Sequence, residues 1–369
     1  MKYYIIAGEA SGDLHGSNLI KALFEQDKNA DVRCWGGNLM ENAGATLVKH
    51  YKELAFMGFV EVIANIPTIF KNIAFCKKDI EVFQPDVVVF IDYSGFNLRI
   101  AKWAKQHKFR TNYYISPQVW ASRSSRVEKI KRDVDMMNVI LPFEKDFYAK
   151  HNYKVNFVGH PLLDAIADRK QVNEANFRKE NRLGDKKIIA LLPGSRKQEI
   201  VKMLSVMLSV VDDFKEYQFV IAGAPSQDYE FYQQFIKTDN VQFINNKTYD
   251  LLSISFAALV TSGTATLETA MFKIPQVVCY KGSAITFAIA KRIITLKFIS
   301  LVNLIMDKEV VTELIQSDFN KKKLTEELTK ILDEKHRENL FLEYYELEKI
   351  LGGKGASSAS ARLIIEGMK

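Results

Sequence analysis

Loops of small and hydroxyl residues follow apolar runs at three places in this chain of 369 residues. Residues 8–13 come directly after the apolar run 3–7, and residues 192–196 and 261–268 follow two later runs. A strand, a turn of small residues and a helix N-terminus together present backbone N–H groups and a positive dipole end to phosphate. Because these loops lie in both halves of the chain, we predict a nucleotide ligand held in a cleft between two domains.

The two later loops supply side chains suited to a diphosphate and a ribose. Arg196 follows Gly194 and Ser195, and its guanidinium can bind a pyrophosphate through two parallel bonds and neutralise a leaving group. Glu268, the last residue of the third loop, lies one turn after the predicted helix start and can accept both hydroxyls of a ribose. The third loop adds hydroxyls and bare N–H groups at Ser262, Gly263, Thr264 and Thr266. The alternatives are a surface salt bridge for Arg196 and a plain helix start for the third loop.

Asp92 stands at the end of the very apolar run 87–91, where open α/β sheets place ligand chemistry. A carboxylate partly removed from water at that position has a raised pKa and can act as a general base. Asn97 either orients this carboxylate or bonds only to backbone. The alternative for Asp92 is capping of the following helix.

The first loop, GEASGD, departs from the G-x-G-x-x-G fingerprint, which argues against a dinucleotide. Gly8 and Gly12 still allow close backbone approach, and Ser11 can cap the next helix. We therefore place Ser11 and Gly12 among the residues that bind the nucleotide. His15 is at least as readily a capping or core residue as a ligand.

Bulk composition excludes several classes of protein. The hydrophobic fraction of 47% and charged fraction of 26% are those of a globular protein. The net charge of +7 suits an anionic ligand or a membrane surface, and no basic segment is interleaved with aromatics, so no nucleic-acid partner is expected. The 3 cysteines are widely spaced and suit a reducing cytosol. A strand already begins at residue 3, so we expect no signal peptide and a cytoplasmic location.

No metal site and no cofactor is predicted. The chain has no HExxH, no Walker A motif and no Cys/His cluster. Asp133 and Asp135 form a DxD pair, but they precede a predicted strand, and we expect a solvated helix face there.

Apolar runs without alternation, typical of strands buried on both faces of a parallel sheet, occur in two series. The runs of the first series are 3–7, 87–91, 112–115, 139–141 and 155–158, and those of the second are 188–192, 219–222, 241–244, 258–260 and 277–280. A charged stretch separates the series, and the chain is expected to be wholly helical after residue 280. We predict an α/β fold of two doubly wound, Rossmann-like domains, 1–163 and 164–345, with a C-terminal helix 346–369 that packs back on the first.

The most apolar stretch, 284–306, contains three cations, Lys291, Arg292 and Lys297. Each would cost about 2.5–3.5 kcal/mol near the centre of a bilayer, which argues against a membrane span. Two readings stay open: a core helix, or a segment that contacts a lipid surface while its cations reach the phosphates.

Taken together, these segments resemble the lipid-A-disaccharide synthases, inverting glycosyltransferases of family 19 with the GT-B fold. The resemblance covers nearly the whole chain, and GEASGD followed by SGTATLE in this order is its most specific part. The matching segments are 7–13, 57–62, 90–97, 114–121, 141–148, 158–164, 191–196, 262–268 and 290–304. Two positions depart from the family pattern: residues 92–97 read DYSGFN instead of DAPDFN, and residues 300–303 read SLVN instead of SLPN.

This resemblance implies transfer of 2,3-diacylglucosamine from UDP to the 6-hydroxyl of 2,3-diacylglucosamine 1-phosphate, forming a β-1,6 linkage. Asp92 matches the family's proposed base, and Arg196, residues 262–266, Glu268 and Asn303 match its UDP side. The first domain would take the acceptor and the second UDP-2,3-diacylglucosamine, without a metal. The resemblance further implies a peripheral position on the cytoplasmic face of the inner membrane, and the C-terminal helices could exchange in a homodimer.

Two other functions are weighed against this one. Another UDP-sugar enzyme of the same fold, such as a UDP-N-acetylglucosamine 2-epimerase or a peptidoglycan-type transferase, would share the second-half loops. A non-enzymatic, nucleotide-regulated membrane-surface protein would keep the phosphate loops but would not require Asp92.

Overall fold

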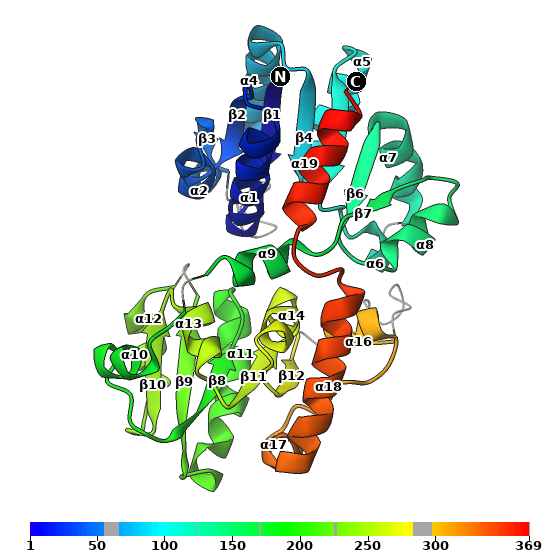
Figure 1. Ribbon diagram of the computed structural model, residues 1–369. Helices are drawn as coiled ribbons and strands as arrows, with labels where there is room; N and C mark the ends of the chain where they lie inside the picture. Colours follow the sequence, from blue (N-terminus) through cyan, green and yellow to red (C-terminus); the bar gives the residue numbers. More distant parts are fainter. Residues whose placement is uncertain (55–65, 123, 170, 225–226, 283–296, 369) are drawn as a thin grey trace. The chain divides into compact units, whose positions relative to one another are not determined.

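The computed structural model describes residues 1–54, 66–122, 124–169, 171–224, 227–282 and 297–368 (Figure 1). The chain divides into two compact units. Unit 1 comprises Met1–Arg169 together with Leu351–Lys369, and unit 2 comprises Lys170–Ile350. Among the described residues, no helix is both long enough and apolar enough to span a membrane.

In the described part of unit 1, the sheet has seven parallel strands in the order β3-β2-β1-β4-β5-β6-β7. The strands are β1 (Lys2–Ala7), β2 (Asp31–Gly36), β3 (Thr46–His50), β4 (Val87–Ile91), β5 (Arg110–Tyr114), β6 (Met136–Val139) and β7 (Asn156–Phe157). The chain runs outward from β1 in one direction through β3, then returns to pair β4 on the other side of β1. The β1/β4 boundary is therefore the topological switch point of this sheet.

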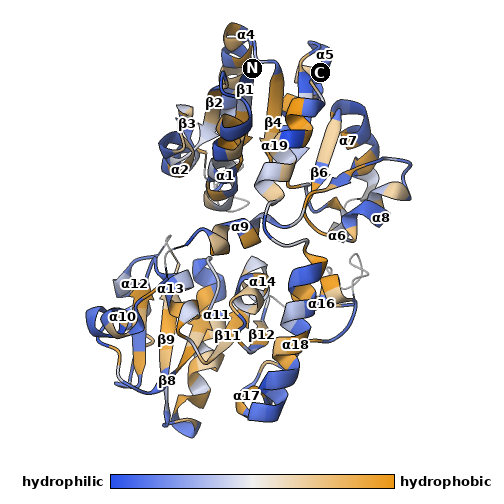
Figure 2. Ribbon diagram, in the orientation of Figure 1, coloured by the Kyte–Doolittle hydropathy of each residue, from blue (hydrophilic) through white to orange (hydrophobic). Residues whose placement is uncertain are grey.

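Helices cover both faces of this sheet. Successive side chains of β1 therefore point alternately into two cores, one on each face. Tyr4 and Ile6 face the core built with α4 (Ile66–Phe83) and α5 (Ser94–Gln106), whereas Tyr3 and Ile5 face the core built with α1 (Ala10–Gln26) and α19 (Ala356–Glu366). The helices of unit 1 are α1 (Ala10–Gln26), α2 (Asn38–Asn42), α4 (Ile66–Phe83), α5 (Ser94–Gln106), α6 (Val119–Ser122), α7 (Val127–Asp133), α8 (Glu144–Ala149), α9 (Pro161–Ala167) and α19 (Ala356–Glu366). Burial on both faces explains why the central strand β4 is hydrophobic throughout (Figure 2).

Unit 2 repeats the arrangement with six parallel strands, described in the order β10-β9-β8-β11-β12-β13. Its strands are β8 (Lys187–Leu192), β9 (Tyr217–Gly223), β10 (Val241–Asn245), β11 (Ala257–Thr261), β12 (Gln276–Tyr280) and β13 (Glu313–Ile315). Its helices are α10 (Glu174–Glu180), α11 (Lys197–Met207), α12 (Tyr229–Gln233), α13 (Thr248–Ser253), α14 (Thr264–Met271), α16 (Leu301–Met306), α17 (Lys321–Leu332) and α18 (Glu334–Ile350). The switch point of this sheet lies between β8 and β11.

Three strands of the structure were not predicted. β2 and the edge strand β3 carry polar residues and no continuous apolar run, and β13 has only three residues. The expectation of a wholly helical chain after residue 280 is wrong, because β13 pairs with β12.

The expectation that Asp133 and Asp135 form a solvated helix face is wrong for Asp133, whereas Asp135 is exposed but lies beyond the end of α7. Asp133 is buried and forms an ion pair with Arg132. Asp135 accepts hydrogen bonds from the backbone N–H and the hydroxyl of Thr111, which joins the beginnings of β5 and β6.

The apolar segment 284–306 lies mostly outside the described residues, as does the matching segment 57–62. Of the segment's described part, residues 301–306 form α16, and Lys297 forms an ion pair with Asp307. The choice between a core helix and a lipid contact rests on residues outside the described ranges.

Candidate functional site

The predicted chemistry-bearing loops lie at the switch points of the two sheets. In unit 1, Gly8 follows β1 and Asp92 follows β4, and these two strands are hydrogen-bonded neighbours. In unit 2, Gly194 follows β8 and Ser262 follows β11, again on neighbouring strands. Ligands of open α/β sheets bind outside the carboxyl ends of the strands at such points. Each unit therefore presents one candidate site.

Asp92 has a fixed and uncommon backbone conformation. Its φ of 42° lies in the left-handed region, and its N–H donates to the carbonyl oxygen of Ile115 at 3.2 Å. Its own carbonyl oxygen accepts a bond from Asn97 Nδ2 at 2.9 Å and another from the Tyr113 hydroxyl. Asn97 thus bonds to backbone and holds the main chain of Asp92, and its side chain does not contact the Asp92 carboxylate. Asp92 as a whole residue is exposed at the switch point.

The Asp92 carboxyl has a raised pKa of about 6, against an ordinary value of 3.8. The main cause is desolvation by the surrounding protein atoms. The negative charge of Glu9 adds to the shift, and a bond from the Tyr93 backbone opposes it. A carboxyl group that ionises near this pH is a suitable general base at neutral pH, because it is deprotonated there and still has appreciable proton affinity.

The first loop acts partly through packing. Gly12 is buried, and a Cβ there would lie 3.0 Å from Ala7 Cβ, so glycine allows α1 to approach β1 closely. Asp13 is buried and accepts bonds from the backbone N–H groups of Gly37 and Met40. Ser11 is exposed in the first turn of α1. Of the two residues predicted to bind nucleotide here, Ser11 is therefore accessible and Gly12 is not, and both belong to unit 1 rather than to the unit of Arg196.

His15 lies deeper in unit 1, where burial lowers its pKa to about 4. Its charge interactions are with Asp164 and with the buried His160, whose pKa is lowered to about 3. A histidine kept neutral in this way is a core residue in this structure.

In unit 2, the loop after β8 leads directly into α11. Gly194 has a φ of 100°, and the Glu199 carboxylate folds over it so closely that a Cβ would lie 2.3 Å from Glu199 Oε2. Ser195 is exposed, and Arg196 is the exposed N-cap residue of α11. No ion pair joins Arg196 to another side chain within the described ranges. A cationic residue therefore stands at the N-terminus of an 11-residue helix, and the two together favour an anion.

Two hydroxyl groups of the loop after β11 donate hydrogen bonds to backbone carbonyl groups of unit 2. Thr266 is fully buried, and its hydroxyl donates to the carbonyl oxygen of Gly263 at 2.8 Å. The Ser262 hydroxyl donates to the carbonyl oxygen of Ile299 at 2.9 Å. Gly263 and Thr264 are exposed at the start of α14, where open space surrounds the Gly263 Cα. We therefore withdraw Thr266 as a direct ligand contact and assign its hydroxyl to the turn that presents Gly263 and Thr264.

Glu268 is half-buried on α14, and the Tyr249 hydroxyl donates to its Oε1 at 2.6 Å. Burial raises the pKa of Glu268, and the bond from Tyr249 partly opposes this shift. Sequence reasoning missed Tyr249, because a tyrosine in a separate helix, α13, carries no local motif that points to Glu268.

Asn303 is fully buried, and its amide makes four hydrogen bonds within unit 2. Nδ2 donates to the Val311 carbonyl and to Glu313 Oε1, while Oδ1 accepts from the N–H groups of Val310 and Val311. An asparagine amide can make about four hydrogen bonds, so none is left for UDP in this conformation. The prediction of a direct UDP contact is therefore withdrawn for Asn303.

The contacts of Asn303 still lead to the third loop. Glu313 also accepts bonds from the N–H groups of Ile299 and Ser300, and the Ile299 carbonyl accepts from Ser262. Asn303 therefore supports the Ser262 hydroxyl indirectly, through Glu313 and the backbone of Ile299.

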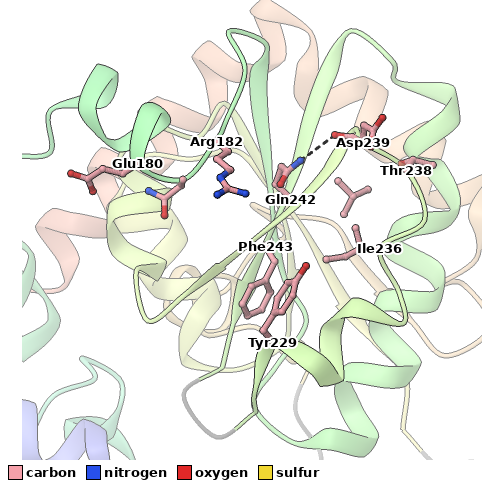
Figure 3. A pocket seen from close by; sticks show the side chains of 10 residues that line it. Glu180, Arg182, Tyr229, Ile236, Thr238, Asp239, Gln242 and Phe243 are labelled. Carbon is pink, nitrogen blue, oxygen red and sulfur yellow. Dashed lines mark hydrogen bonds between the residues drawn. The ribbon is translucent and has the colours of Figure 1, made fainter.

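A separate cavity of about 340 Å³ lies beside β10, away from the switch points (Figure 3). The Tyr229 and Phe243 rings form one wall, and Gln242 donates to the carbonyl oxygen of Asp239. None of the residues predicted to bind the nucleotide lines it. Within the described residues, no group of three or more His, Cys, Asp or Glu side chains is placed to hold a metal ion.

Comparison with known proteins gives consistent matches along the whole chain. A family model described as lipid-A-disaccharide synthetase matches residues 3–361. The lipid-A-disaccharide synthase of Geobacter metallireducens is 36% identical over 369 residues, covering 98% of this chain and 96% of the relative. The enzyme of the same name from Syntrophus aciditrophicus is 38% identical over 365 residues, covering 97% and 95%. That of Coxiella burnetii is 37% identical over 333 residues, covering 89% and 88%.

Solved structures with low sequence identity share the fold. The UDP-GlcNAc 2-epimerase of Methanocaldococcus jannaschii, in complex with UDP-GlcNAc and UDP, matches with a TM-score of 0.68 at 16% identity and covers 100% of both chains. The glycotransferase of kitacinnamycin matches with a TM-score of 0.66 at 13% identity, covering 99% of this chain and 98% of that one. These likenesses confirm the predicted GT-B fold class with its two Rossmann-like domains, and at such identities they show the fold alone.

Proposed function

This chain belongs to the lipid-A-disaccharide synthetase family, and on that basis we propose that Asp92 activates the acceptor and that Arg196 stabilises the departing UDP. The chain is a hexosyltransferase. It transfers 2,3-diacylglucosamine from UDP to the 6-hydroxyl of 2,3-diacylglucosamine 1-phosphate, giving a β-1,6 disaccharide and UDP. The observation that carries the proposed residue roles is the position of Asp92 and Arg196 at the two switch points.

On the acceptor side, we propose that the Asp92 carboxylate removes the proton of the 6-hydroxyl as its oxygen attacks the anomeric carbon of the donor. The new C–O bond forms on the face opposite the leaving group, so the configuration inverts. A pKa of about 6 leaves Asp92 ionised at neutral pH. The bonds from Ile115, Asn97 and Tyr113 to the main chain support this role, because they fix the base before the acceptor binds.

On the donor side, the bond between the anomeric carbon and the UDP oxygen breaks, and negative charge develops on the diphosphate. The Arg196 guanidinium and the N–H groups at the start of α11 and α14 are suited to stabilise that charge. Glu268 is the candidate partner for the ribose hydroxyls, held by Tyr249. Ser195, Gly194, Gly263 and Thr264 complete the proposed donor set, whereas Ser11 belongs to the acceptor unit and Ser262 acts through Ile299.

The proposed activity is tested by supplying the two acylated substrates without added metal and measuring the disaccharide and UDP by mass spectrometry. A parallel reaction with UDP-GlcNAc alone tests the alternative of a 2-epimerase. We expect disaccharide in the first reaction and no epimerised sugar in the second. Epimerised product without disaccharide would favour the alternative function.

We further propose that α4 docks on an anionic membrane surface, where acylated substrates reside. Lys71, Phe75, Lys78 and Val82 recur at spacings of four, three and four residues, so they share one face of this helix. Phe75 and Val82 are 47% and 71% exposed, and the neighbouring Phe70 is 61% exposed. Apolar side chains interleaved with lysines are typical of helices that lie at a bilayer surface.

Vesicle flotation tests this docking. Wild type should float with vesicles containing phosphatidylglycerol, less so at high salt, and the Phe70→Ser/Val82→Ser variant should float less. Leu342→Ser removes a similarly exposed side chain from α18 and serves as the control. Equal flotation of all three proteins would contradict a role for α4.

A homodimer is also proposed, from the position of α19. This helix belongs to unit 1 but follows unit 2 in sequence, through a connection in which Gly352, Gly353 and Gly355 have positive φ. An element attached in this way could be exchanged between two copies. Light scattering at several concentrations tests for the dimer.

A further inference from the structure

Tyr249 lies at the edge of unit 2 that carries the nucleotide-binding loops, although it belongs to none of them. It is the second residue of α13, which begins shortly after β10 ends, and its side chain is half-buried. Glu268 lies on α14, one turn after that helix begins at Thr264. The strands β10 and β11 are members of one parallel sheet, so the two helices begin at the same edge of it.

Two contacts fix the Tyr249 side chain against one face of α14. Its hydroxyl donates to Glu268 Oε1 at 2.6 Å. Its ring packs on Phe272, with ring centroids 5.4 Å apart and ring planes inclined at 56°. The N–H of Phe272 donates to the carbonyl oxygen of Glu268, so these two residues are one helical turn apart and share that face. The tyrosine therefore lies along the face, with its ring at Phe272 and its hydroxyl at Glu268.

The bond from Tyr249 uses only part of the hydrogen-bonding capacity of Glu268. An ionised carboxylate has about four acceptor sites on its two oxygens. Among the groups that the structure describes, the Tyr249 hydroxyl is the one hydrogen-bond donor to this carboxylate, and it donates to Oε1. Oε2 and the second acceptor site of Oε1 are left for a ligand. Two neighbouring hydroxyls of a ribose are donors that fit such a group.

The same bond keeps Glu268 a hydrogen-bond acceptor. Burial raises the pKa of Glu268, and the bond from the Tyr249 hydroxyl opposes that shift, because it stabilises the ionised form. The ionised carboxylate can accept from both ribose hydroxyls, whereas the protonated group would donate a proton of its own. Loss of the tyrosine hydroxyl would therefore free the carboxylate to rotate and would also favour its protonation.

We propose that Tyr249 is a positioning residue of the donor site, which holds Glu268 in the orientation that accepts the 2′- and 3′-hydroxyls of the UDP ribose and so selects a ribonucleotide over a 2′-deoxyribonucleotide. This inference rests on the proposed role of Glu268. Because the carboxylate is ordered before the ligand arrives, less side-chain entropy is lost when the ribose binds. Tyr249 acts through Glu268 and takes no part in the chemical step.

The test measures the affinities of UDP and 2′-deoxy-UDP by calorimetric titration of wild type, Tyr249→Phe and Tyr345→Phe. Phenylalanine keeps the ring that packs on Phe272 and removes only the hydroxyl. Tyr345, which is 55% exposed on α18, provides the matched control. Wild type should bind UDP about tenfold more tightly than 2′-deoxy-UDP, because the deoxy ligand lacks one hydrogen bond to a charged acceptor. This ratio should fall to about threefold or less in Tyr249→Phe and stay unchanged in Tyr345→Phe.

The transfer reaction gives a second readout. In Tyr249→Phe the KM of the donor should rise, while kcat at saturating donor should stay within about twofold of the wild-type value. A fall in kcat with unchanged KM would overturn the inference, because it would place Tyr249 in the chemical step rather than in ribose binding.

The titrations separate positioning from a merely structural role. A wild-type affinity ratio in Tyr249→Phe, or an equal loss of affinity for the two nucleotides, would overturn the inference. If Tyr249→Phe does not fold, Tyr249→Met lacks the same hydroxyl and is judged by the same ratio. Equal binding of UDP and 2′-deoxy-UDP by wild type is a different failure, because it would remove the proposed ribose role of Glu268 itself. Failure of the proposed activity would be seen separately, as no disaccharide from wild type.

Discussion

The backbone N–H of Asp92 donates to the carbonyl oxygen of Ile115 at 3.2 Å, and both residues have left-handed backbone, with φ of 42° and 65°. Each such conformation costs about 1–3 kcal/mol unless neighbouring contacts hold it. Here the holding contacts come from Asn97 and Tyr113 on the carbonyl oxygen of Asp92. The strain is concentrated at the carboxyl ends of β4 and β5, where the reaction is proposed to occur.

Gly8→Ala should destabilise the packing at the carboxyl ends of β1 and β4. A Cβ at Gly8 would lie 2.3 Å from Cγ of Tyr93, the residue after Asp92. Displacing this partly buried ring should lower the free energy of unfolding by about 1–3 kcal/mol and reduce the transfer rate. Gly95→Ala is the matched control, since nothing lies within 4 Å of its added Cβ and alanine favours the helix by about 0.5–1 kcal/mol. Urea denaturation of the two variants checks the difference, and equal stability would contradict the packing argument.

The raised pKa of Asp92 should make stability depend on pH. Because the carboxyl binds its proton more tightly in the folded protein, its contribution is fully present below pH 3.8, the unfolded pKa, and is lost as the pH rises through about 6. Asp92→Asn removes this dependence, so its stability relative to wild type should increase between about pH 4 and about pH 8. Denaturation midpoints measured across this range test the sign. A relative stability that falls with pH would mean that the folded state favours the ionised carboxylate.

Arg196→Ala should weaken UDP binding without affecting stability. The side chain is an exposed N-cap residue, and loss of its charged bonds to a diphosphate should reduce affinity by about 10- to 100-fold. Arg196→Lys should retain part of the affinity, because a lysine keeps the charge and loses the paired geometry. Lys202→Ala removes another exposed cation of α11 and is the control. Calorimetric titration with UDP measures all three; equal affinities would move the diphosphate site elsewhere.

The sequence predicted the parts of the fold that burial on both faces dictates. The core strand β4 is apolar throughout, and β1, β8 and β11 are apolar except for one terminal residue each; all four were found within one or two residues. The edge strand β3 and the short β13 were missed because they bury few side chains and leave no such pattern.

For the site, the sequence predicted which residues lie at the strand ends. It did not predict which of their hydrogen-bonding atoms remain available to a ligand. Asn303 and Thr266 carry suitable groups, and only the fold shows that their hydrogen bonds are already used. Tyr113 was not predicted to act near Asp92, because its hydroxyl reaches the Asp92 carbonyl oxygen from the separate strand β5.

Asn303→Ala should therefore act on stability first. It removes one partner from four hydrogen bonds, two of them buried and two partly buried, which should cost about 2–4 kcal/mol of unfolding free energy. Asn176→Ala, at an exposed position of α10, should be nearly neutral. Denaturation and UDP titration of the folded variants separate the two effects. A large loss of UDP affinity with unchanged stability would restore Asn303 as a direct ligand contact.

The most direct test of the account is the transfer rate of Asp92→Asn against wild type. Asparagine keeps the size of the side chain but cannot take the proton of the 6-hydroxyl, so kcat should fall by about 100-fold or more with UDP affinity unchanged. Asp31→Asn, an exposed carboxylate of the same unit at the start of β2, should keep full activity. Disaccharide formation by Asp92→Asn at the wild-type rate would contradict the assignment of Asp92 as the base.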